Sequence, residues 1–261
     1  MVLNKHAAMA RYDAVFRTNV MTTDPESEVI RDGNLTFVIG PDAAAQANWA
    51  SFLGTAADAV SAIPRAITFF KSRGHGFEWK WFSHDGGETL ARALTAAGFA
   101  PSPLETIVML EVKAPRRLPQ ALAGIVVKPL TRVEQFTEIV KLLAAVWGEE
   151  EPWLGEALRR AWEAAPEHTK FHLAYAGSQL VSCAWIRFEA DIGSLWGGAT
   201  LEGYRGRGIY RHLVDLRYNE ALDRGMSYLL VEASDMSRPI LERLGFSAVA
   251  TTQPYLYHLN S

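Results

Sequence analysis

The stretch at residues 204–211 reads Tyr-Arg-Gly-Arg-Gly-Ile-Tyr-Arg and combines glycines with arginines in a pattern that could bind an anion. Gly206 and Gly208 let the backbone turn sharply and approach a ligand closely, because glycine has no Cβ. An amphipathic segment follows, so the amide hydrogens of its first helical turn would point outward at the positive end of the helix dipole. Three arginines add positive charge there: Arg205, Arg207 and Arg211. A diphosphate is the natural occupant of such a site.

Two common nucleotide-binding loops do not fit this stretch. A dinucleotide-binding loop needs Gly-x-Gly-x-x-Gly in the first βαβ unit, but residue 211 is Arg and the preceding turns are of antiparallel type. A Walker A loop needs Gly-Lys followed by Ser or Thr, and this stretch lacks that sequence. The alternative that stays open is a surface helix that happens to begin with glycine and arginine.

The elements around the loop predict a mixed α/β layout. We expect strands at 125–129, 171–175, 179–188, 194–200, 228–232, 247–250 and 255–258, and helices over 136–146, 154–164, 208–223 and 237–244. The turns between 171 and 200 favour an antiparallel meander. In the helix at 208–223, Ile209, Leu213 and Leu216 are expected on one apolar face.

The N-terminal half is expected to form a separate domain. Its predicted elements are helices at 5–17, 43–72 and 87–97 and strands at 35–39, 77–82 and 106–112. Prolines and arginines then interrupt the apolar pattern, so we expect a linker at 116–124 between domains at 1–115 and 125–261.

Composition excludes several function classes. The 29 acidic and 26 basic residues give a net charge of -3, and no run of Lys or Arg is dense enough to indicate a nucleic-acid partner. A single cysteine, Cys183, excludes an intrachain disulfide. No signal-peptide core or bilayer-length apolar run is present, so we expect a cytoplasmic protein with no membrane partner.

The loop resembles the signature of the GNAT superfamily of N-acetyltransferases, Gln/Arg-x-x-Gly-x-Gly/Ala. Residues 205–210 match it except at Tyr210, where the family has a small residue. A second family feature, a helix that ends in Gly-Phe before a strand, appears at Gly245 and Phe246. The resemblance covers about residues 125–259 and implies a mixed, mostly antiparallel sheet flanked by helices.

The resemblance also implies acetyl-coenzyme A (acetyl-CoA) as cofactor. The amides of residues 207–211 would hold its pyrophosphate, the strand at 198–201 would pair with its pantetheine arm, and the thioester would lie where this strand splays from 228–232. A strand amide near Leu201 would stabilise the thioester carbonyl. The expected cofactor-binding residues are Ala199, Thr200, Leu201, Arg205, Gly206, Arg207, Gly208, Ile209, Tyr210, Arg211, Ser234 and Ser237.

Direct attack by an amine needs a base and an acid. The family's usual acid is a tyrosine at the position that is Leu241 here, so Ser234, Ser237, Tyr255 and Tyr257 are the open alternatives. Glu202, Glu232 and Asp235 are candidate bases, and each has the alternative role of a solvated carboxylate or helix cap. We select Glu202, Glu232, Ser234 and Tyr257 as candidate catalytic residues.

An acidic, aromatic segment between the first two helices of the C-terminal half is a candidate acceptor site. Trp147, Glu150 and Trp153 would suit a cationic amine, although an acidic loop is usually a wet surface. Cys183 is expected to be a small buried thiol. His168 and His172 would lie about 13 Å apart in an extended chain, too far to share a metal ion, and no metal site is expected.

The segment Leu-x-x-Ala-Gly-Phe at residues 94–99 resembles the family's Gly-Phe tail, so the first domain is hypothesised to be a degenerate GNAT-like domain in tandem with the second. The alternative is an unrelated α/β extension. Two functions remain: an acetyl-CoA-dependent N-acyltransferase acting on a small-molecule or peptide amine, and a CoA-binding sensor or scaffold without catalysis. A homodimer is compatible with either.

Overall fold

The computed structural model of the chain describes residues 3–85, 87–117, 122–148 and 151–259. It divides into two compact units. Unit 1 comprises Met1–Met109 and Glu232–Ser261, and unit 2 comprises Leu110–Val231. The C-terminal segment therefore packs with the N-terminal part of the chain. The expected domain division, with its linker at 116–124, differs from these compact units, and residues 118–121 lie outside the described ranges.

Unit 2 is built on a mostly antiparallel sheet. Its strands follow the spatial order β7 (Val126–Pro129), β8 (Thr169–Ala176), β9 (Gln179–Glu189), β10 (Ile192–Thr200) and β11 (Tyr228–Ala233), with the last two residues of β11 in unit 1. Neighbouring strands are antiparallel except β10 and β11, which are parallel. Strands β8 to β10 confirm the expected meander.

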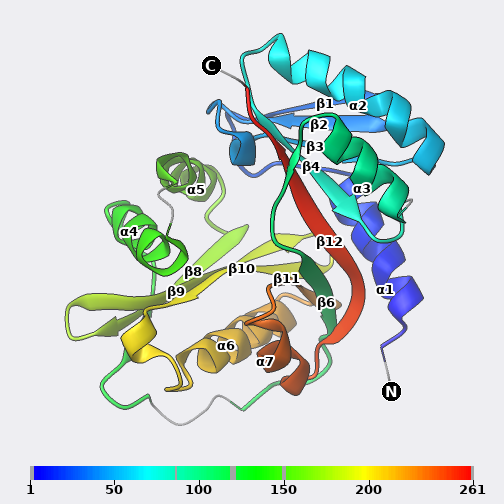
Figure 1. Cartoon of the computed structure of the whole chain (residues 1–261). Helices are drawn as coiled ribbons and strands as arrows, with labels where there is room; N and C mark the ends of the chain where they lie inside the picture. Colours follow the sequence, from blue (N-terminus) through cyan, green and yellow to red (C-terminus); the bar gives the residue numbers. More distant parts are fainter. Residues whose placement is uncertain (1–2, 86, 118–121, 149–150, 260–261) are drawn as a thin grey trace. The chain divides into compact units, whose positions relative to one another are not determined.

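Helices cover both faces of this sheet (Figure 1). On one face, α4 (Gln135–Trp147) and α5 (Pro152–Ala164) pack on Phe171, Leu173 and Trp185. On the other face, α6 (Ile209–Asp223) packs on Ala174, Val181 and Ala184 through its first apolar residues. The mixed α/β class expected from the sequence is therefore observed.

A bulge redirects β10 in the middle of the sheet. Trp196 lies opposite Trp185, but the next paired residue is Ala199 opposite Cys183, so β10 carries one extra residue. Parallel pairing with β11 covers only Ile192–Ser194 against Tyr228–Leu230. The pairing of the two strands therefore ends just before the bulge.

Unit 1 repeats this arrangement of elements. Its sheet order is β1 (Glu28–Asp32), β2 (Leu35–Ile39), β3 (Trp49–Phe52), β4 (Phe77–Phe82), β12 (Ser247–Tyr257) and β6 (Glu105–Glu111), with β5 (Ala100–Pro101) beside β12. The helices and short turns are α1 (Lys5–Tyr12), the π-helix η1 (Asp13–Thr18), the 3-10 turn η2 (Ala45–Ala47), α2 (Ala56–Lys71), α3 (Gly87–Ala96) and α7 (Arg238–Arg243). Large aromatic side chains from β2, β3, β4 and α2 dominate its core.

The N-terminal and C-terminal halves of the chain contain the same sequence of elements. Three antiparallel strands lead into a helix, a strand parallel to the third strand, a second helix that ends at Gly-Phe, and a last strand. In unit 1 the parallel contact is shorter, since only Trp49 and Ala50 of β3 pair with β4. Residues 77–82 and 105–111 thus form strands of a sheet, as the tandem hypothesis needs.

Three expectations about the elements were wrong. The region 43–72 is not one helix, because it contains β3 before α2 begins at Ala56. The strand β1 was not expected. The segments 247–250 and 255–258 form one continuous strand, β12, which pairs with β4 and β6 in unit 1.

Within the ranges that the structure describes, no helix combines the length and apolarity needed to cross a bilayer.

Candidate active site

The glycine-arginine loop connects β10 to α6 through a short 3-10 turn, η3 (Glu202–Tyr204). Gly206 and Gly208 have φ values of +74° and +80°, a conformation that residues with a Cβ rarely adopt. Gly208 is the N-cap of α6, and as a glycine it has no side chain with which to cap the helix. In the described part of the chain, α6 therefore begins without a side-chain capping bond from its N-cap residue.

The arginines of the loop are exposed and held in place by backbone oxygens. Arg205 donates from Nε to the carbonyl of Thr200 at 3.2 Å, and Arg207 donates from Nη2 to that of Gly203 at 3.0 Å. Neither forms an ion pair with an acid in the described part of the chain. Arg211 lies 3.7 Å from the carboxylate of Asp215 and is 65% exposed. The loop thus presents cationic groups beside the free end of α6.

Tyr210, the departure from the family signature, lies in the first turn of α6. Its ring packs against Gly198 on β10, the residue that follows the tight bulge position Gly197. A side chain at Gly198 would overlap the Tyr210 ring, so the bulky residue fits because its neighbour is glycine.

One backbone amide beside the strand expected to bind the cofactor is already paired within the protein. The amide of Leu201 donates to the carbonyl of Val181 at 2.9 Å. It is therefore not available to a thioester carbonyl, and the role of an amide near Leu201 stays a prediction. The carbonyl of Ala199 accepts from the Ser182 hydroxyl at 2.7 Å, and the hydroxyls of Ser182 and Thr200 lie 2.8 Å apart.

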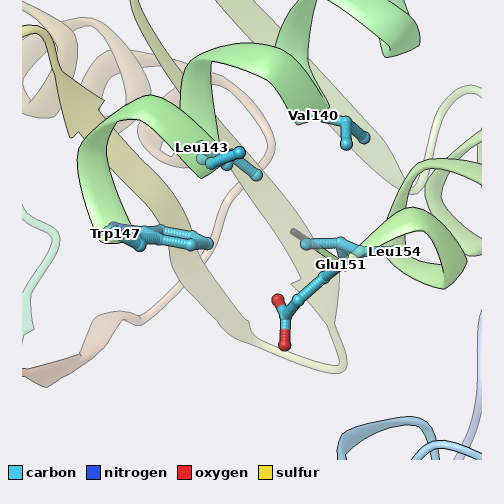
Figure 2. A pocket seen from close by; sticks show the side chains of 6 residues that line it. Val140, Leu143, Trp147, Glu151 and Leu154 are labelled. Atoms are coloured by element: carbon cyan, nitrogen blue, oxygen red, sulfur yellow. The ribbon is translucent and has the colours of Figure 1, made fainter. Parts of the chain in front are cut away.

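A small pocket lies between α4 and α5 (Figure 2). Its lining is formed by Val140, Leu143, Ala144, Trp147, Glu151 and Leu154. It encloses about 180 Å³, counting space open to solvent. The space away from open solvent has room for about one water molecule, far below the roughly 300–1,000 Å³ of a typical ligand site. Trp147 was an expected substrate-binding residue, Trp153 does not line the pocket, and Glu150 lies outside the described residues.

The candidate catalytic residues do not gather in one unit. Glu202 lies exposed in η3 of unit 2. Ser234 and Ser237 form a local turn at the start of α7 in unit 1, with their hydroxyls 3.3 Å apart. Tyr257 belongs to the aromatic core of unit 1, where its ring lies 5.1 Å from that of Phe99. Their catalytic roles stay predictions.

Glu232 belongs to a partly buried polar cluster in unit 1. Its carboxylate accepts a 2.6 Å hydrogen bond from the Tyr12 hydroxyl and forms an ion pair with Lys80. Burial, followed by the charge of Glu232, raises the pKa of Tyr12. Burial opposes the charged form of Lys80, but the charges of Glu232, Glu78 and Glu105 together outweigh this effect and raise the Lys80 pKa. The role of Glu232 as a base stays a prediction.

Glu105 completes this cluster from β6. Burial, and then the negative charge of Glu232, raises its pKa to about 7. Glu78 on β4 also has a raised pKa, first because of burial. Sequence reasoning missed Tyr12, Lys80 and Glu105. Together with Glu232 they come from four elements that lie far apart along the chain, and no spacing in the sequence relates them.

Leu241 and Cys183 are both fully buried. Leu241 has an apolar side chain, so it provides no hydroxyl at the position of the family's usual acid. Burial raises the pKa of the Cys183 thiol to about 12, which makes it an unreactive core residue as expected. His172 lies on β8 and contacts the Glu220 carboxylate at 2.8 Å. Among described residues, no group of three or more potential ligands is placed to hold a metal ion.

Residues 135–246 match the model of the acetyltransferase (GNAT) family. The chain is also similar in fold to a GCN5-related N-acetyltransferase from Kribbella flavida, with a TM-score of 0.72 and 14% identity over 100% of this chain and 97% of that one. A GCN5-related N-acetyltransferase from Sphaerobacter thermophilus gives a TM-score of 0.63 at 11% identity, covering 85% and 76% of the two chains. A tandem GNAT protein of the clavulanic acid biosynthesis pathway gives 0.57 at 13% identity, covering 92% and 86%. No curated protein matches the chain.

The class of protein follows from these findings together with the loop. Residues 135–246 carry a GNAT acetyltransferase domain, and the whole chain has the fold of such proteins. Membership of this family implies acyl transfer from an acyl-CoA donor.

Proposed function

We propose that this protein is an acetyl-CoA-dependent N-acyltransferase that transfers the acetyl group to an amine by direct attack. The observation that carries the proposal is the N-terminus of α6, which begins at Gly208 without a side-chain cap and is flanked by exposed arginines. The amides of this turn and the helix dipole favour an anion, and the pyrophosphate of coenzyme A supplies one.

The separation of β10 from β11 supports the position of the pantetheine arm. Their parallel pairing ends at Ser194 and Leu230, while β10 continues to Thr200 and leads directly into the loop. An extended arm along β10 would bring the thioester toward the gap between the strands. The cofactor would supply the activated acyl group, and the chain would bind and orient it.

The acceptor is proposed to be an amine with an apolar portion. The pocket between α4 and α5 combines the apolar side chains of Val140, Leu143 and Leu154 with Trp147, which is 49% exposed, and the carboxylate of Glu151. An apolar part of the acceptor would contact Val140, Leu143 and Leu154. A protonated amine would be attracted to Trp147 and to the carboxylate of Glu151.

Unit 1 is proposed to be a GNAT-like domain that does not bind cofactor. The helix that corresponds to α6 in its element order is α2, and its N-terminus is already occupied. Thr55 accepts from the amide of Asp58, and the Asp58 carboxylate accepts from the amide of Thr55 at 3.1 Å. This reciprocal capping box places a negative charge where a pyrophosphate would need amides.

A second candidate function is a CoA-binding sensor without catalysis. The burial of Leu241 favours it, because the family's usual acid is absent from that position. The two functions separate in one experiment. Calorimetry measures acetyl-CoA binding, and a thiol reagent measures coenzyme A release over a panel of amines. Binding with amine-dependent release supports the enzyme, binding without release supports the sensor, and absence of binding rejects both.

A further inference from the structure

Arg217 is a fully buried arginine in the middle of α6, with 1% of its surface exposed. It continues the buried face of the helix at the i+4 spacing of Ile209 and Leu213. Arginine is rarely buried without a charged partner, because desolvation of the cation is costly. In the part of the chain that the structure describes, no ion pair includes Arg217.

Backbone carbonyls take the place of an acid around this guanidinium. Nε donates to the carbonyl of Leu213 at 2.9 Å, within the helix. Nη1 donates to the carbonyl of Trp185 at 3.0 Å and to that of Trp196 at 3.3 Å. Burial lowers the pKa of Arg217 to about 10, against the opposing effects of Tyr210, Glu220 and Cys183, so it stays charged at neutral pH.

The two tryptophan carbonyls mark the bulge of β10. Trp185 and Trp196 are directly opposite each other, and the register shifts immediately after Trp196. Gly197 follows with a φ of +61°, and a Cβ there would lie 1.7 Å from the Trp185 ring. Arg217 therefore contacts β10 at the residue before the bulge, on the part of the strand that has already separated from β11.

The geometry of the Trp196–Gly197 peptide gives this contact a chemical consequence. The peptide is trans, so the amide hydrogen of Gly197 points away from the carbonyl that faces Arg217. A cationic donor on the carbonyl polarises the peptide and strengthens its N-H as a hydrogen-bond donor. The guanidinium thus fixes the direction of this amide and increases its partial positive charge.

We propose that Arg217 is a positioning residue for acyl transfer, which holds the Trp196–Gly197 peptide in the bulge and strengthens it as a donor toward the acyl-CoA along β10. This inference rests on the proposed function. Electrostatic stabilisation by oriented backbone amides is most effective where the amides are fixed before the reaction. A purely structural role predicts something different, namely that Arg217 matters for folding and not for turnover of the folded protein.

The test compares Arg217→Met and Arg217→Lys with a control on the same helix, Arg224→Met. Arg224 lies beyond the end of α6 and donates to the carbonyl of Glu167, away from the bulge. Thermal unfolding, acetyl-CoA affinity, and kcat and KM for coenzyme A release are measured for each. We expect Arg217→Met to remain folded but to be less stable, because Met fills the buried volume while the carbonyls of Trp185 and Trp196 lose a donor.

For Arg217→Met we expect at least a tenfold fall in kcat/KM for acetyl-CoA, with KM for the amine within twofold of the wild type. Arg217→Lys should recover part of this loss, and Arg224→Met should match the wild type. Wild-type kcat/KM in folded Arg217→Met overturns the proposal. If that variant does not fold, Arg217→Gln decides, because it also lacks the cation, and wild-type kinetics in it overturn the proposal as well.

Hydrogen exchange provides a readout that does not depend on turnover. Exchange over residues 192–200 should accelerate in the Arg217 variants, while exchange over residues 169–176 of β8 stays unchanged. Unchanged exchange over 192–200 contradicts the positioning role even if the wild type shows no activity. Wild type that fails to bind acetyl-CoA rejects the proposed function instead, so the two failures are distinguishable.

Discussion

The ring of Tyr210 occupies the space where a side chain at Gly198 would lie, since a Cβ there would come within 2.6 Å of Tyr210 Cε2. The two residues belong to β10 and to the first turn of α6, so their contact fixes the loop between them at both ends. A family signature with a small residue at position 210 would leave this space empty. Tyr210 and Gly198 therefore form a matched pair.

The first prediction follows from this pair. Gly198→Ala should lower the free energy of unfolding by about 1–3 kcal/mol, the usual effect of overpacking, measured by denaturant titration. The double variant Gly198→Ala/Tyr210→Ala should recover part of the loss, because it removes the clashing ring. Gly203→Ala is the control, since a Cβ there has nothing within 4 Å. Equal losses for Gly198→Ala and Gly203→Ala would disprove the matched pair.

The second prediction concerns the anion site. Gly208 and Gly225 flank the two ends of α6 with similar φ values, +80° and +70°, so an aspartate meets similar backbone strain at either position. Gly208→Asp places a negative charge beside the proposed pyrophosphate and should raise the Kd for acetyl-CoA at least tenfold, or about 1.4 kcal/mol.

The control variant for that prediction is Gly225→Asp, which should bind acetyl-CoA within about twofold of the wild type. It carries the same added charge at the opposite end of the helix. Calorimetry at two salt concentrations also checks the electrostatic origin, because screening should narrow the gap between the variants. Similar affinities for both variants at low salt would contradict the assignment of this loop.

The loop was predictable because its information is local. Two glycines with positive φ, the three arginines around them and the helix that follows are all encoded within residues 204–211 and the amphipathic stretch after them. The meander and the class of fold were predictable for the same reason, since turn sequences and hydrophobic periods report on neighbouring residues.

The partners of Arg217 and Glu232 were not predictable, because they come from distant parts of the chain. Arg217 follows Ile209 and Leu213 at i+4 spacing, but its charge suggests an exposed position and Leu216 was assigned to the buried face instead. Glu232 was expected to be a base, whereas Tyr12 and Lys80 hold it from 220 and 152 residues away. No pattern along the chain specifies such contacts.

The third prediction is a pH dependence of unit 1. The pKa of Glu105 in the folded state, about 7, lies above its ordinary value of 4.5 because of burial and then the negative charge of Glu232. The folded state therefore holds this proton more tightly, so the associated stability is fully present below about pH 4.5 and is lost as pH rises through 7. The positive charge of Lys80 lowers the pKa of Glu105, and the negative charge of Glu78 raises it.

Glu105→Gln should remove this dependence. We expect its Tm to exceed that of the wild type at pH 8 and to match it at pH 5. For a protein of this size, a Tm shift of about 2–4 °C corresponds to about 1 kcal/mol of unfolding free energy. Glu88→Gln serves as the control, since Glu88 is 91% exposed and forms only a 3.9 Å surface pair with Arg92. A Glu105→Gln variant with the same Tm difference at both pH values would refute the assignment.

The fourth prediction concerns β12, which follows the GNAT motif in sequence but pairs with β4 and β6 of unit 1. Thr252, which is fully buried, donates to the carbonyl of Trp81 at 2.8 Å, and Tyr255 packs into the aromatic core. A chain that stops after Phe246 should therefore lose the cooperative unfolding of unit 1. A chain that stops after His258 keeps all of β12 and should unfold like the full protein.

Hydrogen exchange locates the damage caused by the shorter truncation. Residues 77–82 of β4 should lose protection, because they lose the neighbour that pairs with them from Thr252 to Tyr257. Residues 169–189 of β8 and β9 pair within unit 2 and should keep their protection. The opposite pattern, with β8 and β9 exposed and β4 intact, would mean that the last strand stabilises the domain expected at 125–261 and not unit 1.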